Sequence, residues 1–258
     1  MITLKTKEQV ELLRQNALLV SKTLAYVGRM IEPGVTTLAL NDAAEKYIRD
    51  HGAVPAFLGY GGFPYALCIS VNNVIVHGFP SAYELKDGDI VSVDCGTIMN
   101  GYYGDSAYTF PCGNVSEEDR KLLQVTKESL YKGIEKAIAG NRVGDIGYAV
   151  QQHAESNGFS VVREMVGHGL GTELHEAPEV PNYGRKGTGK KLQSGMVICI
   201  EPMVNAGCRE VYLDDNGWSV VTRDDAKSAH FELTVHINGG QPEVLSTYEF
   251  IENPNIKL

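Results

Sequence analysis

Few cysteines occur in this sequence, and none of the five belongs to a C-x-x-C pair. An odd number of isolated thiols in apolar stretches is typical of a reduced protein, which excludes a disulfide framework and a zinc ribbon as the basis of the fold. The chain also lacks a long apolar run, and its first thirty residues have the charge pattern of an amphipathic helix rather than of a signal peptide. These absences predict a soluble cytoplasmic protein without a membrane span.

Basic residues are in the minority, with 23 lysines and arginines against 32 aspartates and glutamates and a formal net charge of -9. No basic run stands out beyond residues 185–191, so a nucleic-acid-binding surface is not expected. The length of 258 residues is enough for one large domain or for two halves that share a core. We expect residues 1–258 to form a single catalytic domain.

Helix and strand signals are mixed along the chain. Thr6 and Gln9 form a capping-box pattern at the start of one helix, and Ser116 precedes an acidic first turn at the start of another. Apolar spacing and end signals predict helices over 7–30, 37–50, 117–139 and 145–157. Apolar and alternating runs predict strands over 66–71, 74–76, 90–93, 159–162 and 229–237. The mixture predicts an α+β fold.

Two aspartates are prominent in the stretch 90–110. Asp94 ends an apolar strand, and Asp105 lies in the strand that returns after the Asn100-Gly101 turn, so the two carboxylates can face each other across a hairpin. Adjacent carboxylates repel each other and lose solvation, and a bound cation is the common remedy. Asp beside Gly is also ordinary turn chemistry. By itself this stretch leaves a metal site and a plain turn as alternatives.

The second half of the chain repeats features of the first. Residues 85–94 are echoed by 192–201, with a leucine, a glycine and the final acid in register, and 35–38 are echoed by 143–146. Two matches in the same order at nearly the same offset predict a duplicated half. The predicted halves span roughly 33–110 and 140–237.

Duplication turns the two aspartates into a set of four carboxylates. Glu201 corresponds to Asp94, and Glu232 corresponds to Asp105. Four buried carboxylates without partners would be very destabilising, so a metal site becomes the expected explanation. His168 is the natural nitrogen donor, because the glycines on both sides let the backbone pass close to a ligand. Four carboxylates and one imidazole suit two adjacent divalent ions.

Other histidines differ in their contexts. His77 follows a strand in a Val-His-Gly segment, and His175 lies in an irregular glycine-rich loop, so we expect both to have a function. His230 and His236 share one face of the predicted strand with Glu232. For these two, packing or hydrogen bonding is as good an explanation as metal ligation.

Three apparent motifs lack the context that their functions require. Residues 175–178 begin like a zincin helix, but Pro178 breaks a helix and no second histidine follows at the needed spacing. Residues 184–191 resemble a phosphate loop without its final Ser or Thr, so a mobile charged loop is expected there. Residues 167–171 fall short of a dinucleotide fingerprint.

With these residues in this order, the sequence resembles the bacterial, type I methionine aminopeptidases over essentially its whole length. The resemblance is carried by Asp94-Cys95-Gly96, Gly101-Tyr102-Tyr103-Gly104-Asp105, Gly167-His168-Gly169-Leu170-Gly171, His175-Glu176-Ala177-Pro178, Ile200-Glu201-Pro202 and Phe231-Glu232. It implies the pita-bread fold, in which pseudo-twofold halves form a curved, mostly antiparallel sheet flanked by helices. It also implies the reaction, the hydrolytic removal of an N-terminal methionine that precedes a small second residue.

The resemblance implies a role for each metal-site residue. Asp94 would chelate one divalent ion, and His168 and Glu201 would bind the other. Asp105 and Glu232 would bridge the two ions. Iron, manganese, cobalt and zinc all suit such a site, and a metal-activated water would attack the scissile carbonyl.

Substrate contacts follow from the same resemblance. Glu201 would carry a proton from water to the leaving amine, His175 would stabilise the carbonyl oxygen, and His77 would hold the scissile nitrogen or the following backbone. The methionine side chain would lie in a pocket lined by Phe57, Tyr60, Phe63, Cys68, Leu174 and Trp218. A monovalent cation would bind near Asn72, Val74 and Ser228.

This sequence departs from the family pattern at two positions that affect the width of the pocket. Leu174 stands where relatives often have an aromatic residue, and Gly61 stands where many have a larger polar residue. The expected partners are N-terminal methionine peptides, nascent chains and the ribosome, with no membrane or specific nucleic acid, and the expected state is a monomer.

Two alternative functions are weighed against this one. Prolidases and related exopeptidases share the motifs but carry a long N-terminal domain, which this sequence does not include. Metal-free pita-bread binding modules lose metal ligands, whereas all five ligand positions are filled here.

Overall fold

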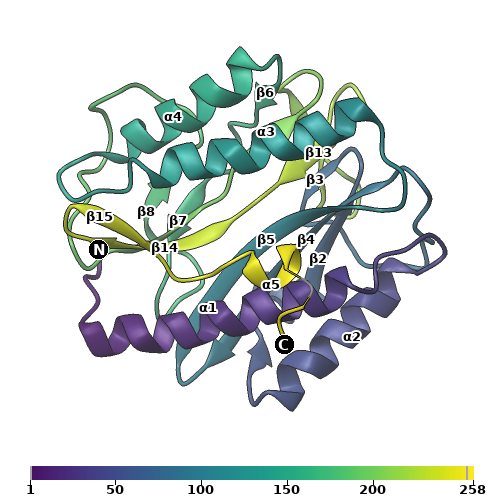
Figure 1. The fold of residues 1–258 in the computed structure, drawn as a ribbon, viewed down its shortest axis with the longest axis horizontal. Helices are drawn as coiled ribbons and strands as arrows, with labels where there is room; N and C mark the ends of the chain where they lie inside the picture. The colour runs from purple at the N-terminus through teal and green to yellow at the C-terminus, as the bar shows by residue number, and fades with distance from the viewer. Residues whose placement is uncertain (1, 254) are drawn as a thin grey trace.

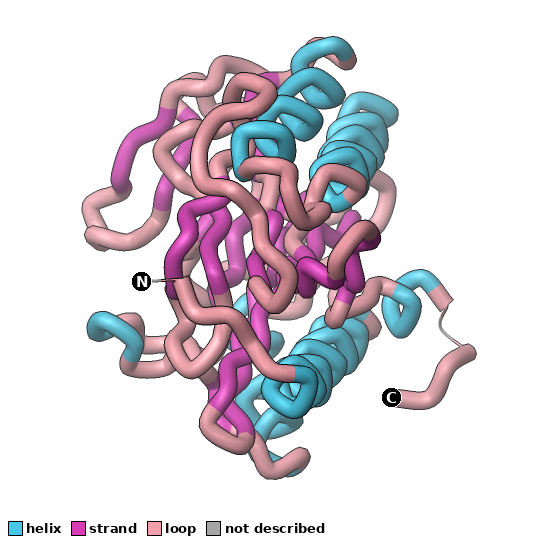
Figure 2. Tube along the Cα trace, turned by 90° about the vertical axis from the view of Figure 1, so that its left-hand side faces the viewer, coloured by secondary structure: helices cyan, strands magenta, loops and turns pink. Residues whose placement is uncertain are grey.

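The computed structural model describes residues 2–253 and 255–258. Two pairs of long helices lie on opposite sides of a centre made of strands (Figure 1). The first pair is α1 (Lys7–Gly28) and α2 (Thr37–Asp50), and the second is α3 (Glu117–Ile134) and α4 (Val143–Ser156). A short helix, α5 (Glu249–Glu252), lies near the C-terminus. The view turned by 90° again shows helices at the outside and strands between them (Figure 2).

Helices α1 and α2 form where the sequence predicts them. The Thr6 hydroxyl accepts a hydrogen bond from the N–H of Gln9, and the Gln9 side chain accepts one from the N–H of Thr6. These bonds satisfy two N–H groups that the helix itself leaves unpaired. Helix α2 ends as predicted before Gly52, whose φ of 77° continues no helix. Both helix predictions are confirmed, with α1 ending at Gly28 instead of residue 30.

Helix α3 starts after Ser116 as predicted, but the predicted end at residue 139 is wrong. The helix ends at Ile134, where the backbone changes to three-residue hydrogen bonds such as that from the N–H of Ala137 to the carbonyl of Ile134, and the chain then bonds to distant segments. The N–H of Ala139 donates to the carbonyl of Gly239 at 2.9 Å. This contact turns the chain away from the helix axis and toward the last hairpin.

The strands form four small sheets, and every strand pairing among the described residues is antiparallel. One sheet contains β1 (Val54–Pro55), β2 (Leu67–Val71), β4 (Ile90–Met99) and β5 (Tyr102–Pro111). The second contains β6 (Ser160–Val161), β10 (Met203–Asn205) and β13 (Ser228–His230), and the third contains β3 (Val74–Val76), β11 (Val211–Leu213) and β12 (Val220–Thr222). The fourth contains β7 (Gly167–Gly169), β8 (Glu176–Val180), β9 (Val197–Ile200), β14 (Leu233–Asn238) and β15 (Gln241–Val244). The predicted α+β class with a mostly antiparallel sheet is confirmed.

Strands β4 and β5 form the predicted hairpin around Asn100-Gly101, but β4 is longer than predicted. Asp94 therefore lies inside the strand and not at its end. The register places Asp94 opposite Ala107, and Asp105 opposite Gly96. The two aspartates share one face of the hairpin as diagonal neighbours.

The predicted strand 229–237 is wrong, because the chain forms two strands in two different sheets. Strand β13 pairs with β10, β14 pairs with β9, and the chain bends at Phe231-Glu232. The facing chain bends at Pro202, which has no N–H to donate and whose carbonyl accepts the N–H of Phe231 at 3.3 Å. An isolated bridge joins Glu232 to Ala107 of β5. The bend thus brings Glu232 to the hairpin that carries the two aspartates.

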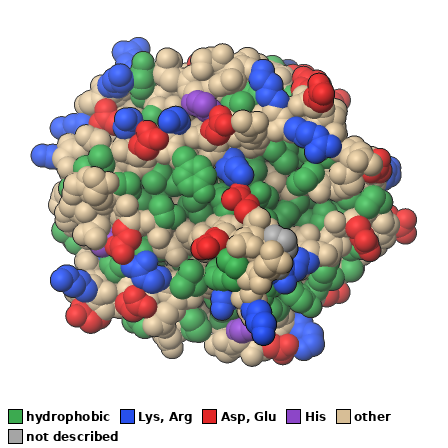
Figure 3. Space-filling model, in the orientation of Figure 1, with side chains coloured by type: hydrophobic (Ala, Val, Ile, Leu, Met, Phe, Trp, Pro, Cys, Tyr) green, Lys and Arg blue, Asp and Glu red, His purple; other side chains and the backbone are tan. Residues whose placement is uncertain are grey.

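Two large apolar cores flank the centre. Helices α1 and α2 pack on β2 and β4 around Leu24 and Ile48, whereas α3 and α4 pack on β9 and β14 around Leu130 and Ile146. This order of elements agrees with the predicted duplication, whose boundaries stay a prediction. None of the helices in the described part of the chain has the length and apolar character to span a membrane. On the face drawn in Figure 3, charges of both signs are interspersed.

Candidate active site

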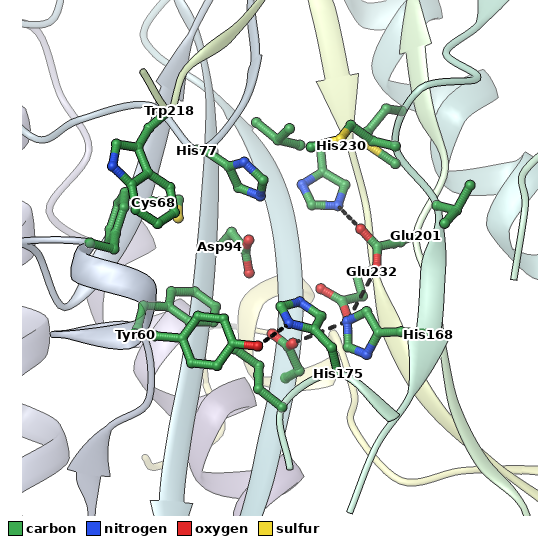
Figure 4. Close-up of a pocket in the computed structure, with 18 residues that line it drawn as sticks. Tyr60, Cys68, His77, Asp94, His168, His175, Glu201, Trp218, His230 and Glu232 are labelled. Carbon is green, nitrogen blue, oxygen red and sulfur yellow. Dashed lines mark hydrogen bonds and ion pairs between the residues drawn. The ribbon is translucent and has the colours of Figure 1, made fainter. Parts of the chain in front are cut away.

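A pocket with a volume of about 180 Å³ lies among the central strands. One part of its wall is acidic and rich in histidine, and the other is aromatic and aliphatic (Figure 4). The polar lining consists of Asp94, Asp105, Glu201, Glu232, His77, His168, His175 and His230. The apolar lining consists of Phe57, Tyr60, Phe63, Cys68, Val76, Met165, Val166, Leu174, Met203 and Trp218. All of the predicted metal-site, catalytic and methionine-pocket residues line this one cavity, while their roles stay predictions.

The four carboxylates reach the pocket from three regions of strand. Asp94 and Asp105 come from the β4–β5 hairpin, Glu201 follows β9, and Glu232 lies between β13 and β14. Burial raises the pKa of Asp94 and of Glu201 to about 7. Burial, and then neighbouring carboxylates, raise the pKa of Asp105 and of Glu232 well above the ordinary value. The protein alone therefore does not stabilise four negative charges here.

Several polar atoms of the cluster have no protein partner. Among the described residues, Asp94 Oδ1, Asp105 Oδ1 and Glu232 Oε1 are buried side-chain oxygens without a hydrogen-bond partner. An unpaired buried polar atom costs about 1–3 kcal/mol, and more when the group is charged. Carboxylate oxygens beside an imidazole are ligands that hard-to-borderline divalent ions accept. The residues present therefore fit a divalent metal site.

His168 has the geometry of a nitrogen ligand. Its Nδ1 lies 2.9 Å from the carbonyl oxygen of Gly169, so Nδ1 carries the proton and Nε2 keeps a free lone pair in the neutral ring. Nε2 lies 3.6 Å from Asp105 Oδ2 and 3.4 Å from Glu201 Oε1. Burial lowers the pKa of His168, which favours the neutral ring that a metal requires.

The glycines beside His168 have a different purpose from the predicted one. A Cβ at Gly167 would collide with the carbonyl oxygen of Cys199, and a Cβ at Gly169 would collide with the carbonyl oxygen of Ala177. These glycines therefore allow close approach to the neighbouring strands β9 and β8. We predicted that glycine is needed at these positions so that the backbone can approach a ligand. The structure shows that it is needed for packing against the neighbouring strands.

His77 and His175 face the pocket from loops on opposite sides of it (Figure 4). His77 follows β3 with a φ of 57°, a left-handed conformation uncommon for a residue other than glycine. Burial, followed by the nearby His230, lowers the pKa of His77 to about 4. Burial, followed by His77, lowers the pKa of His175. Both rings are neutral at pH 7, so each offers one N–H donor and one acceptor.

The apolar wall is built from aromatic rings in edge contact. The Phe63 ring lies 5.2 Å from that of Trp218 and 5.4 Å from that of Phe79. Burial raises the pKa of the Cys68 thiol well above its ordinary value, so this side chain is neutral and polarizable. At Gly61, a Cβ would lie 3.4 Å from the Trp218 ring.

Sequence reasoning left His230 undecided and did not include it in the site. His230 lines the pocket, and its Nε2 lies 3.6 Å from Glu201 Oε2. Within the described chain this nitrogen has no hydrogen-bond partner. The sequence did contain an indication that His230 belongs to the site. His230 stands two residues before Glu232, so the two share a face of the predicted strand. His236, which continues that pattern, instead bonds to Glu243 at 2.7 Å and does not line the pocket.

Cys199 was also absent from the predicted site. Its Sγ lies within 4.8 Å of the ligand atoms of Asp105, His168 and Glu232. Burial raises the pKa of this thiol well above its ordinary value, and Sγ lies 3.8 Å from the Thr234 hydroxyl. Cys199 does not line the pocket and packs in the apolar core beside it, so it is described as a residue behind the carboxylates.

The residues predicted to bind a monovalent cation lie close to one another. The N–H of Ser228 donates to the carbonyl of Asn72 at 2.9 Å, and Val74 begins β3 two residues further on. Asn72 has a φ of 54°. Cation binding at this place stays a prediction.

Comparison with known proteins defines the class. The model of metallopeptidase family M24 matches residues 11–238. The chain therefore belongs to this family of metallopeptidases, which agrees with a buried cluster that fits divalent metal.

Within that family, the chain is highly similar to methionine aminopeptidases. It is 53% identical over 246 residues to the methionine aminopeptidase of Clostridium perfringens, which covers 95% of this chain and 99% of the relative. It is 49% identical to methionine aminopeptidase 1 of Bacillus subtilis, over 92% of this chain and 96% of the relative. The crystal structure of methionine aminopeptidase from Rickettsia prowazekii superposes with a TM-score of 0.95 at 41% identity, over 96% and 100% of the two chains. The resemblance to methionine aminopeptidases is confirmed.

More distant structures share the fold alone. The prolidase from Pyrococcus furiosus has a TM-score of 0.78 at 23% identity, covering 95% of this chain and 65% of the prolidase. The structural similarity to both the methionine aminopeptidase and the prolidase confirms the predicted pita-bread fold.

Proposed function

We propose that this protein is a metal-dependent aminopeptidase that removes the N-terminal methionine from peptides and nascent proteins with a small second residue. One observation carries the proposal. Buried carboxylate oxygens without protein partners and the free nitrogen of His168 line the same cavity as an apolar wall of aromatic rings. The first group fits metal-assisted hydrolysis, and the second fits recognition of an apolar side chain.

Five side chains would hold two divalent ions. Asp94 would chelate one ion, His168 and Glu201 the other, and Asp105 and Glu232 would bridge them. Orphaned oxygens on both aspartates and on Glu232 support this assignment. When bound, the ions supply Lewis acidity that makes a water molecule a strong nucleophile near neutral pH. Iron, manganese, cobalt and zinc are all acceptable to this donor set.

The chain's own residues would move protons and orient the peptide. Glu201 would carry the proton from water to the leaving amine. Its position on the pocket wall, beside His168 and His230, supports this role. His175 would donate a hydrogen bond to the carbonyl oxygen as negative charge develops on it. His77, held neutral by burial, would hydrogen-bond the scissile nitrogen or the backbone that follows it.

The methionine side chain would lie against the apolar wall. Phe63 and Trp218 supply ring edges, Cys68 supplies a polarizable sulfur, and Phe57, Tyr60 and Leu174 complete the enclosure. A thioether gains from sulfur–aromatic contacts of this kind. Leu174 and Gly61, both smaller than the residues often found in relatives, would widen the pocket.

The wider setting is proposed on less specific grounds. We place the protein in the cytoplasm as a monomer that acts on nascent chains at the ribosome, with a monovalent cation near Asn72, Val74 and Ser228. The cysteines of the described chain are all free thiols, which supports a reducing compartment.

Steady-state rates on short peptides test the substrate assignment. The manganese-loaded protein is assayed on Met-Ala-Ser beside otherwise identical peptides that begin with Leu, Ala or Xaa-Pro. We expect the highest kcat/KM on Met-Ala-Ser. A preference for any of the other peptides would replace the methionine assignment with that of another exopeptidase of the same fold.

A further inference from the structure

A buried ion pair joins the segment before α1 to the loop that carries His175. Lys5 Nζ lies 2.6 Å from Glu176 Oε2, and the two side chains are 3% and 12% exposed. The residues are 171 positions apart in the sequence. Glu176 directly follows His175 and begins β8. Loss of one partner from a pair with so little exposure is costly, because it leaves a buried charge without compensation.

The Glu176 carboxylate also supports the loop, residues 170–175, that connects β7 to β8. Its Oε1 accepts a hydrogen bond from the N–H of Thr172 at 2.9 Å, while Oε2 accepts from Lys5. Among the N–H groups of residues 172–175, that of Thr172 alone has an acceptor in the described structure. The second part of the loop therefore depends on this one carboxylate for its backbone hydrogen bonding.

The first part of the loop is held differently. The N–H of Leu170 donates to the carbonyl of Val197 at 3.0 Å, and the carbonyl of Gly171 accepts from the N–H of Tyr103 at 2.9 Å. These bonds attach residues 170 and 171 to neighbouring strands and do not involve the ion pair. Loss of the ion pair should consequently release residues 172–175 without detaching the whole loop.

Gly171 leaves the space that the ion pair occupies. A Cβ at this position would collide with the Glu176 carboxylate and with the Lys5 ammonium group. Gly171 is not among the glycines with a positive φ, so space and not backbone conformation requires glycine here. The Lys5–Glu176 pair is thus packed against the loop backbone.

Lys5 itself is anchored on both sides. Its N–H donates to the carbonyl of Gly195 at 2.7 Å, and the next residue, Thr6, caps α1. The ammonium group therefore extends from a fixed backbone, which lowers the conformational entropy that the ion pair costs.

Two residues of the loop line the active-site pocket, namely Leu174 and His175 (Figure 4 labels His175). The His175 ring contacts two other pocket residues, since its Nδ1 lies 2.7 Å from the Tyr60 oxygen and its centroid lies 4.5 Å from that of His168. Those contacts involve the ring and not the backbone. The position of the backbone that carries the ring is left to the contacts of the loop.

We infer that Lys5 and Glu176 are positioning residues that keep residues 172–175, and with them His175, in place at the pocket. Lys5 compensates the charge of the Glu176 carboxylate, which can then stay buried and accept from Thr172. Without Lys5 the carboxylate is a buried charge without a cation, which favours its movement into solvent and the release of Thr172. The consequence for catalysis rests on the proposed function, whereas the hold on the loop does not.

Amide hydrogen exchange followed by NMR in the presence of zinc, which is diamagnetic, tests the hold on the loop. In Lys5→Met we expect the Thr172 amide to exchange about 10-fold faster or more, relative to the amide of Leu130 in α3. Lys5→Met combined with Glu176→Gln should recover most of the protection, because a glutamine oxygen can accept from Thr172 without a buried charge. Such recovery is not expected if Lys5 contributes packing alone.

Turnover on Met-Ala-Ser should follow the same order. We expect kcat to fall about 10-fold in Lys5→Met and to recover in part in the double variant, since small displacements of a catalytic group are costly. Metal content should not change. Glu176→Ala is a second single variant, which removes the acceptor of Thr172 and leaves no buried carboxylate, and it should also accelerate exchange at Thr172.

Lys127→Met is the matched control. Lys127 Nζ lies 2.8 Å from Glu252 Oε1 in an ion pair between α3 and α5, and Lys127 does not line the active-site pocket. Its loss should change neither the exchange of Thr172 relative to Leu130 nor kcat.

Unchanged exchange at Thr172 in Lys5→Met or in Glu176→Ala would overturn the inference. Equal acceleration at Thr172 and Leu130 would also overturn it, because the ion pair would then contribute to overall stability alone. The expected exchange with an unchanged kcat would contradict the link to His175. An inactive wild-type protein whose variants show the expected exchange would instead count against the proposed function alone.

Discussion

Asp94 and Asp105 lie on the same face of the β4–β5 hairpin but are staggered, with Asp94 opposite Ala107 and Asp105 opposite Gly96. Diagonal neighbours in an antiparallel pair are about 7–8 Å apart, which leaves room for an ion between two carboxylates. Each aspartate keeps one oxygen without a partner in the described structure. The stagger therefore lets both carboxylates face the same bound metal site.

Asp105→Asn should abolish most of the peptidase activity, because an amide cannot balance two cations as a bridging carboxylate does. We expect a loss of about 10²-fold or more in kcat on Met-Ala-Ser. In the metal-free protein the same change removes a buried, repelled carboxyl group, so thermal unfolding should occur at the same or a higher temperature. Calorimetry with and without manganese measures this.

Asp215→Asn is the control for that variant, since Asp215 is an exposed residue of the β11–β12 turn. It should leave both activity and metal-dependent stabilisation unchanged. An Asp105→Asn protein that is stabilised by manganese as strongly as the wild type would contradict the bridging role.

His175→Ala should reduce kcat by about 10²-fold or more, the usual effect of removing a donor to a developing oxyanion. Metal content should stay close to that of the wild type, because His175 is outside the proposed ligand set. Turnover on Met-Ala-Ser and metal analysis of the same sample provide the comparison. Unchanged turnover would show that another group stabilises the carbonyl oxygen.

Gly167→Ala should destabilise the fold, since the added Cβ collides with the carbonyl oxygen of Cys199 on the paired strand. Relief of such a collision within a packed sheet costs about 1–3 kcal/mol. Gly240→Ala provides the control, because a Cβ there meets no atom within 4 Å in the described structure. Urea denaturation should separate the two variants, and equal midpoints would contradict this account of Gly167.

The Asp119 carboxylate should make the unfolding free energy depend on pH in the acid range. Burial alone would raise its pKa, but hydrogen bonds from Ser116 and Lys227 outweigh burial and lower it. Lys227 Nζ lies 2.9 Å from Asp119 Oδ2. A pKa that is lower in the folded than in the unfolded state adds stability above the unfolded pKa, and this stability is lost as the pH falls through the folded pKa.

Asp119→Asn should therefore cost about 1 kcal/mol of unfolding free energy at pH 7 and progressively less in acid. Urea denaturation of both proteins, from pH 7 down to the lowest pH at which they fold, follows the difference. A difference that grows as the pH falls has the wrong sign for this mechanism.

Local signals in the sequence were enough to predict the helix starts and the main hairpin. The helix cap at Thr6 and Gln9 and the turn at Asn100-Gly101 form from residues that are close in the sequence. Such features can be predicted from the local sequence alone. The split of the strand 229–237 could not be predicted in this way. It depends on the contact of Phe231 with Pro202, which is local in space and distant in sequence.

The site residues that could be predicted from the sequence are those whose side-chain type and flanking residues indicate metal binding. The four carboxylates and His168 were found from their contexts, and all of them line one pocket. His230 was missed because a histidine on a strand face has several ordinary explanations, and only its distance to Glu201 distinguishes them. The strand contacts of Gly167 likewise depend on tertiary packing that its flanking sequence does not contain.

The central claim is that Asp94, Asp105, His168, Glu201 and Glu232 hold the divalent ions on which peptidase activity depends. The most direct test removes metal with a chelator, measures the residual content, and then titrates manganese or iron while following Met-Ala-Ser hydrolysis. We predict an inactive metal-free protein, up to two bound ions per chain, and activity that rises as they bind. A protein that binds neither metal and stays inactive would contradict the claim and favour a metal-free binding module.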